Sequence, residues 1–293
     1  MKRKMRNVFL ALLFLTGFGV MAYPTVANQW NTYRQSKLIR HYKEVTEDFK
    51  EKDFTREWEK AEHYNDGITV NVPKTEGVFE EKTKGQRDTE YNKVLNINDD
   101  GMMGYLTIPV INVDLAIYHG TSDAILQTGV GHIEGTGLSV GGENHHSVLA
   151  AHRGLPSAKL FTDIDQLKVE DEFYIHILDR TLAYKVDQIL PMVDKDDRKT
   201  LDQAMQIEKG KDYVTLFTCT PYGVNSHRLL VRGVRTAYYE AAAQDTPTDK
   251  IGRCFQDYYM FFLIGGACVT VMGIGLVKIW LKKRRRQKEK KYR

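Results

Sequence analysis

Two uncharged, mostly apolar runs lie near the ends of this 293-residue chain and constrain what it can fold into. The first run extends from Asn7 to Tyr23 and follows four basic residues in the first six positions. The second run extends from Tyr258 to Val277, and ten basic residues and one acid follow it. A run of this length spans a hydrocarbon core of about 30 Å at about 1.5 Å per residue. Both runs therefore predict membrane-spanning helices, because a core helix would not carry such basic flanks.

The basic residues flank both runs on the side of the chain terminus. Since Lys and Arg collect on the cytoplasmic side of a membrane, we expect both termini in the cytoplasm and the middle of the chain outside the cell. The protein is thus expected in the cell membrane, with the membrane itself as a partner. A cleaved signal peptide is the alternative for the first run, but Tyr23 to Asn28 offer no convincing small-x-small cleavage site.

Charge and cysteine usage narrow the possible functions of the middle segment. The net charge of the chain is +4, and because both ends are strongly basic, the middle is acidic. An acidic segment does not favour nucleic acid as a partner. Of three cysteines, Cys268 lies in the second run and Cys254 just before it, which leaves Cys219 alone in the exposed part. A disulfide within that part is therefore excluded.

The pattern of apolar residues changes twice before the acidic middle becomes β-rich. Residues 28–62 repeat apolar side chains at steps of three and four, which predicts a helix packed on the domain. Residues 63–100 are polar and interrupted by Gly and Pro, which is typical of a mobile loop or lid. Seven short apolar or alternating segments then predict strands in a closed barrel or a sandwich: 104–108, 113–118, 147–151, 172–178, 181–189, 213–218 and 227–234.

Three residues at the ends of predicted strands can perform chemistry together. Cys219 ends one β-rich run, His152 ends another, and Arg228 begins a third. Taken singly, each has an ordinary structural interpretation: a small buried hydrophobe, a structural histidine, and a solvated or ion-paired arginine. Taken together, a thiolate can attack a carbonyl carbon, histidine can protonate the leaving amine, and arginine can stabilise an oxyanion. Such a site needs no metal and no organic cofactor.

The motifs around these residues resemble those of the sortase family. Thr215 to Cys219 resembles the family's Thr-Leu-x-Thr-Cys signature, and Ala151 to Gly154 resembles its histidine segment. Arg228 falls where the family has its catalytic arginine, and the resemblance covers about residues 100–235. It implies an all-β fold, a closed eight-stranded sortase-type barrel, here with an N-terminal helix, a lid-like segment before the barrel and two transmembrane helices.

The resemblance also implies a two-step transpeptidation. Cys219 is expected to attack the Thr–Gly bond of an LPXTG-like sorting signal and to form a thioacyl intermediate. His152 is expected to protonate the departing amine and later to deprotonate the incoming one, while Arg228 stabilises the tetrahedral states. The sequence leaves open whether the cysteine and histidine form an ion pair or are neutral at rest.

Within the family, the two predicted spans, the N-terminal helix and the long segment before the barrel are similar to class C, the pilin polymerases of Gram-positive bacteria. The acceptor is then expected to be a lysine amine of the next pilin subunit. One departure concerns the lid, which in class C usually carries an Asp-Pro-aromatic motif over the cysteine. This chain contains no Asp-Pro dipeptide, so no residue is assigned to plug the site.

These expectations divide the chain into seven segments. They are the basic start and first anchor (1–27), the helical segment (28–62), the lid-like segment (63–100), the catalytic barrel (101–238), a linker (239–257), the second span (258–281) and a basic cytoplasmic tail (282–293). Three other functions remain as alternatives: a housekeeping sortase that anchors surface proteins to the cell wall, an exported cysteine hydrolase, and a membrane-tethered scaffold or adhesin.

Overall fold

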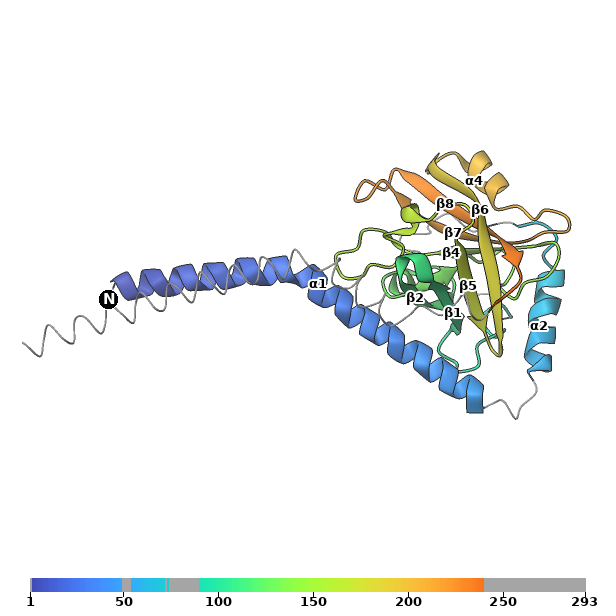
Figure 1. Ribbon diagram of the computed structural model, residues 1–293, viewed down its shortest axis with the longest axis horizontal. Helices are drawn as coiled ribbons and strands as arrows, with labels where there is room; N and C mark the ends of the chain where they lie inside the picture. Colours follow the sequence, from blue (N-terminus) through green and yellow to red (C-terminus); the bar gives the residue numbers. More distant parts are fainter. Residues whose placement is uncertain (1, 49–53, 72, 74–89, 240–293) are drawn as a thin grey trace, which may run out of the picture. The chain divides into compact units, whose positions relative to one another are not determined.

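The computed structural model describes residues 2–48, 54–71, 73 and 90–239, which form a closed β-barrel accompanied by helices (Figure 1). In chain order the elements are α1 (Lys2–Asp48), α2 (Thr55–Asp66), β1 (Met102–Ile108), η2 (Pro109–Ile111), β2 (Val113–His119), α3 (Asp123–Leu126), β3 (Val130–His132), β4 (His145–Ala150), η3 (Ile164–Gln166), β5 (Glu172–Ile177), β6 (Arg180–Asp194), α4 (Arg198–Ala204), β7 (Asp212–Thr220) and β8 (His227–Thr236).

The barrel closes in the strand order β1-β2-β3-β4-β7-β8-β6-β5, with β5 pairing back to β1. Two pairs, β2 with β3 and β4 with β7, are parallel, and the remaining pairs are antiparallel. The predicted eight-stranded closed barrel is confirmed. The sequence segments predicted as strands correspond to seven of these strands, and the eighth, β3, was not predicted because it has only three residues and a glycine at its centre.

The inward side chains of the strands form the main core. Leu106 of β1, Ile175 of β5 and Leu216 of β7 are fully buried members of one apolar cluster. Gly104 lies where β1 approaches β5, and a Cβ atom there would stand 2.3 Å from the carbonyl oxygen of His176. Only glycine permits that approach, so this position fixes how closely β1 and β5 can pack.

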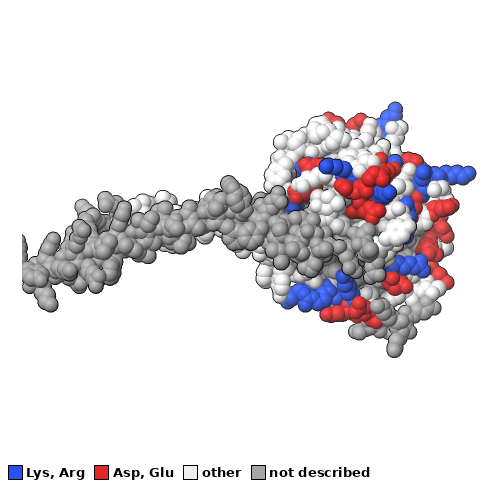
Figure 2. Space-filling model, in the orientation of Figure 1, with Lys and Arg blue, Asp and Glu red and all other residues white. Residues whose placement is uncertain are grey.

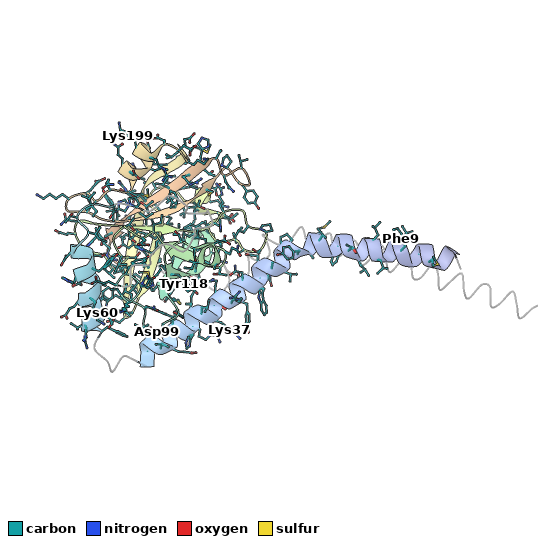
Figure 3. All side chains as sticks on the ribbon, turned by 180° about the vertical axis from the view of Figure 1, so that it is seen from behind. Phe9, Lys37, Lys60, Asp99, Tyr118 and Lys199 are labelled. Carbon is teal, nitrogen blue, oxygen red and sulfur yellow. The ribbon has the colours of Figure 1, made fainter. Side chains whose placement is uncertain are left out.

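The predicted N-terminal helix is present, and it is longer than the segment expected from the sequence. Helix α1 is continuous from Lys2 to Asp48 and contains Pro24, which lacks the N–H that an interior helical residue normally donates. In Figure 3, Lys37 of α1 and Tyr118 of β2 are labelled where the two elements run side by side. The second helix, α2, ends at Asp66. Its last residues thus fall within the segment expected to be lid-like.

Three polar side chains on one face of α1, those of Asn28, Gln35 and Tyr42, attach the helix to the barrel. They are spaced seven residues apart, which returns a side chain to nearly the same face. The bonds are from Lys159 N to Asn28 Oδ1 (2.8 Å), from Ala116 N to Gln35 Oε1 (2.9 Å), from Gln35 Nε2 to Thr128 O, from Tyr42 OH to Met103 O (3.0 Å) and from Leu178 N to Tyr42 OH (2.9 Å). Each bond satisfies a backbone group of the barrel, so this face of α1 is fixed in register.

Helix α2 contributes directly to the barrel core. Trp58 and Ala61 are buried in the main apolar cluster, and Trp58 Nε1 donates to Asp179 Oδ1 at 2.9 Å. Asn65 makes two bonds with the backbone of Leu138, at 2.7 and 3.2 Å. These polar contacts fix α2 on the barrel, and Asn65 among them lies within the segment expected to be lid-like.

The structure does not confirm the first predicted span, which lies in α1, and it does not describe the second. Among the described residues, no helix combines the length and the apolar character that crossing a bilayer requires. The second predicted span lies outside the described residues, as do residues 72 and 74–89 of the lid-like segment.

On the barrel, acidic and basic side chains are interspersed over the face seen in Figure 2.

Candidate active site

The cysteine and the arginine predicted to be functional lie opposite each other on neighbouring strands. Strands β7 and β8 pair in antiparallel register, and this register sets Cys219 against Arg228 and Thr220 against His227. Side chains directly opposite in such a pair have Cβ atoms about 4.5–5.5 Å apart and share one face of the sheet. The register therefore places both side chains on one face, where the charge of Arg228 acts on the thiol of Cys219.

The predicted histidine reaches the same row from the other side of β7. Strands β4 and β7 are parallel, and Ala150, the last residue of β4, pairs with Phe217. The register continues beyond that pair, because Ala151 N donates to Phe217 O at 3.3 Å and Thr218 Oγ1 donates to Ala151 O at 2.7 Å. Counting one residue further sets His152 beside Cys219.

His152, which follows the end of β4, lies in one row with Cys219 of β7 and Arg228 of β8. We name it the catalytic row after the roles predicted for these residues. The next row consists of Arg153, Thr220 and His227. Arg153 follows His152, Thr220 follows Cys219, and His227 precedes Arg228. The three residues predicted to be catalytic therefore lie in one row of the strand register, and their catalytic roles stay predictions.

Burial shifts the pKa values of the cysteine and the histidine of this row in opposite directions, each toward the neutral form. Cys219 is 4% exposed, and its burial raises the pKa of the thiol, while the positive charge of Arg228 partly opposes that rise. Burial lowers the pKa of His152, and the carboxylate of Asp123 partly opposes that fall. Both shifts disfavour the charged form of each group. A neutral thiol beside a neutral imidazole is the resting state that these pKa directions favour.

Asp123 is a residue of the site that sequence analysis did not identify. Its Oδ1 lies 3.9 Å from Nε2 of His152, and its Oδ2 accepts a bond from Gln127 Nε2 at 2.6 Å. Asp123 begins α3, which connects β2 to β3. The chain between Asp123 and His152 contains no motif that would have linked them, because their proximity depends on the parallel pairing of β3 with β2.

Arg228 is oriented by the turn that precedes β8. Its Nη1 donates to the carbonyl oxygens of Asn225 and His227, both at 3.1 Å. Asn225 has a φ of 59°, a left-handed conformation that asparagine tolerates better than most residues. Backbone carbonyls thus hold one edge of the guanidinium, and the positive charge stays beside Cys219.

The side chains near the row suit acyl transfer through a thioester. Among the described residues, no group of three His, Cys, Asp or Glu side chains could hold a metal ion. His146, a buried histidine in β4, bonds Gln206 O and Thr215 Oγ1, each at 2.8 Å, and so has a structural role. A nucleophilic thiol, a proton carrier and a fixed cation are the three groups that such chemistry requires.

Comparisons with known proteins agree with this geometry. A family model described as "Sortase domain" matches residues 106–236. The crystal structure of sortase C1 from Streptococcus agalactiae superposes with a TM-score of 0.61 at 44% identity, covering 69% of this chain and 100% of that chain. A Streptococcus pneumoniae sortase C, whose structure was described in terms of catalysis and pilin substrate specificity, superposes with a TM-score of 0.62 at 42% identity, covering 69% of this chain and 97% of that chain.

A curated relative matches over a shorter region. Sortase SrtE2 from Streptomyces coelicolor is 32% identical over 146 residues, which make up 46% of this chain and 56% of that protein. The chain therefore spans little more than half the length of this relative. The family model, which matches residues 106–236, covers most of the barrel, including the positions of His152, Cys219 and Arg228.

Proposed function

The chain belongs to the sortase family, and from this premise we propose that it is a cysteine transpeptidase that polymerises pilin subunits. It cleaves an LPXTG-like sorting signal between Thr and Gly and joins the acyl group to a lysine amine of the next subunit. The observation that carries the proposal is the register of β4, β7 and β8, which sets a thiol, an imidazole and a guanidinium in one row.

The first half of the reaction forms a thioester on Cys219. As the thiol attacks the scissile carbonyl carbon, its proton passes to His152, which is neutral beforehand because burial lowers its pKa. The oxyanion that develops is stabilised by the fixed charge of Arg228. The tetrahedral state collapses when the C–N bond breaks, and His152 gives its proton to the departing glycine amine.

The second half resolves the thioester with an amine. The incoming lysine amine attacks the thioester carbonyl and loses a proton to His152, and Arg228 again stabilises the oxyanion. The C–S bond then breaks, and the thiolate of Cys219 recovers the proton from His152. One amide bond has been exchanged for another, so the reaction needs no external oxidant, reductant or energy source.

Assignment to the pilin-polymerising class rests on similarity. The two sortase C structures cover all or nearly all of their own length on this chain, at 42–44% identity. One of them was described in terms of pilin substrate specificity. A long helix before the barrel, seen here as α1, agrees with the architecture expected of that class. The segment 63–100 is proposed as its lid, without an Asp-Pro-aromatic anchor.

We further propose that the enzyme is held at the cell membrane with its barrel outside and both termini in the cytoplasm. Basic residues on the terminal side of both apolar runs support this orientation. The large apolar side chains of the first run are exposed on α1, including Phe9 at 65% and Leu13 at 61%. Exposure of many large apolar side chains on one helix is unfavourable in water and fits a lipid or protein environment.

The proposal is tested by following the products with purified full-length enzyme in detergent. An LPXTG-type peptide is supplied together with a pilin subunit and a small amine of the cell-wall precursor type, and the products are separated by mass. Peptide joined to a pilin lysine is the expected result, and Cys219→Ala should abolish it. Joining only to a small amine of the cell-wall precursor type would favour a housekeeping sortase. Release of the cleaved peptide to water alone would favour a hydrolase, and either result would overturn the polymerase proposal.

A further inference from the structure

Arg153, the residue directly after His152, is a buried cation with three partners. Its side chain is 10% exposed. Nη1 donates to Thr220 Oγ1 at 3.1 Å, Nε donates to Thr162 O at 3.1 Å, and Nη2 pairs with the carboxylate of Asp165. An arginine keeps its charge at every working pH, so a buried guanidinium must be held by such contacts.

The bond to Thr220 has a particular place in the strand register. Thr220 follows Cys219, as Arg153 follows His152, so the bond joins the residues just beyond the histidine and the cysteine of the catalytic row. Strand β4 ends at Ala150, and the last backbone bond of the β4–β7 pair is made by Ala151. Beyond that point the Arg153 side chain provides the link between the two chain segments that hold His152 and Cys219.

The other partners of Arg153 fix the loop that follows His152. Thr162 accepts from Arg153 through its carbonyl oxygen, and its hydroxyl accepts a bond from Gly154 N at 3.3 Å. The carbonyl oxygen of His152 accepts a bond from Phe161 N at 3.1 Å. The segment from 161 to 165 therefore holds the backbone of residues 152–154 from one side, while Thr220 holds Arg153 from the other.

We propose that Arg153 is a positioning residue, which keeps the imidazole of His152 in line with the thiol of Cys219 by joining the ends of β4 and β7 through Thr220. This inference rests on the proposed cysteine transpeptidase function. Arg153 does not touch the reacting atoms in this role. Its effect is on the probability that histidine and cysteine are aligned when substrate is bound, and misplacement by about 1 Å can lower a rate by about 100-fold.

The inference predicts a specific pattern among four variants. Thr220→Val removes the hydroxyl that accepts the Arg153 bond at constant volume, and Arg153→Gln removes the guanidinium. Each should lower kcat by about tenfold or more while KM changes by less than about twofold, because alignment and not binding is affected. Thr220→Ser retains the acceptor and should keep nearly full kcat. The double variant of Arg153→Gln and Thr220→Val should be no slower than the slower single variant.

A second buried ion pair provides the matched control. Arg232 of β8 is 15% exposed, pairs with Asp187 at 2.7 Å and lies four residues beyond Arg228. Arg232→Gln removes the ion pairs with Asp187 and, at 3.1 Å, with Glu208, and should lower the melting temperature at least as much as Arg153→Gln. Because Arg232 is not next to the catalytic row, kcat should stay at the wild-type value.

The measurement is kcat and KM for peptide–amine joining by the full-length enzyme and these variants, together with their melting temperatures. A kcat of Thr220→Val within twofold of wild type would overturn the inference. It would also be overturned if the loss of kcat in the double variant equalled the product of the losses in the two single variants. Thr220→Val also carries the test if Arg153→Gln does not fold. An inactive wild type would refute the proposed function instead, so the two failures are distinguishable.

Discussion

Replacing Tyr42 by Phe removes one oxygen atom from the contact between α1 and the barrel. The ring of Tyr42 is 1% exposed and belongs to an apolar cluster with Met102 and Tyr105. Its hydroxyl donates to Met103 O at 3.0 Å and accepts from Leu178 N at 2.9 Å. Burial raises the pKa of Tyr42, so the hydroxyl keeps the proton that it donates.

The cost of this change comes from the two backbone groups that lose their partner. Phenylalanine preserves the ring and its packing, so little apolar contact is lost. The amide of Leu178 and the carbonyl of Met103 are left without a partner in a buried site, and each such group costs about 1–3 kcal/mol. The expected loss in the free energy of unfolding is therefore about 2–6 kcal/mol, a large part of the total of about 5–15 kcal/mol typical of a domain.

Urea unfolding followed by tryptophan fluorescence measures this loss, because Trp58 is 3% exposed in the barrel core and becomes solvated on unfolding. Tyr105→Phe is the matched control, because its ring centroid lies 6.3 Å from that of Tyr42 and its hydroxyl makes no hydrogen bond to any described residue. The control should lose less than about 0.5 kcal/mol. A loss below about 1 kcal/mol in Tyr42→Phe, or equal losses in the two variants, would refute the view that this hydroxyl fixes α1 on the barrel.

Three further predictions concern protonation. Arg228→Gln removes the charge that opposes the effect of burial on the pKa of Cys219, so this pKa should rise. The pH midpoint of Cys219 alkylation by iodoacetamide should then move upward. An unchanged midpoint would show that the two groups do not interact. Asp123→Asn should lower the pKa of His152 in an NMR titration of its imidazole, whereas an unaltered titration would exclude this contact. Burial lowers the pKa of His132 from 6.5 to about 4. Between these pH values the unfolded chain binds a proton that the folded chain does not. The free energy of unfolding should therefore fall by up to about 3 kcal/mol as the pH drops from about 6.5 to about 4. Urea unfolding across this range should show a shallower decline in His132→Asn, and equal declines would contradict the assignment.

Local patterns in the sequence were sufficient to predict seven of the strands, and the family resemblance supplied the closed eight-stranded barrel that the structure confirms. The catalytic roles of Cys219, His152 and Arg228 stay predictions. The strand that ends in Cys219 and the one that begins near Arg228 are long apolar runs with clear boundaries. The strand β3 was missed because three residues carry too little periodicity, and its parallel pairing with β2 depends on the folded chain. That pairing also brings Asp123 to His152, which explains why the carboxylate was not predicted.

Contacts that depend on register were equally invisible in the sequence. Arg153 stands in the quoted histidine motif, yet nothing in the motif indicates that its partner is Thr220, 67 positions away. The spacing of Asn28, Gln35 and Tyr42 shows that they share a helix face, but their partners are backbone groups of the barrel. Backbone partners leave no signature in side-chain chemistry, so only the structure reveals them.

The central claim is that Cys219 forms a thioester with the acyl half of a sorting signal. Intact mass spectrometry of the full-length enzyme with an LPXTG-type peptide, followed by peptide mapping, tests this claim most directly. The expected result is a mass increase equal to the peptide without its glycine portion, located on Cys219, absent in Cys219→Ala and lost when an amine is added. Peptide cleavage that continues in Cys219→Ala, or an adduct located on another residue, would contradict it.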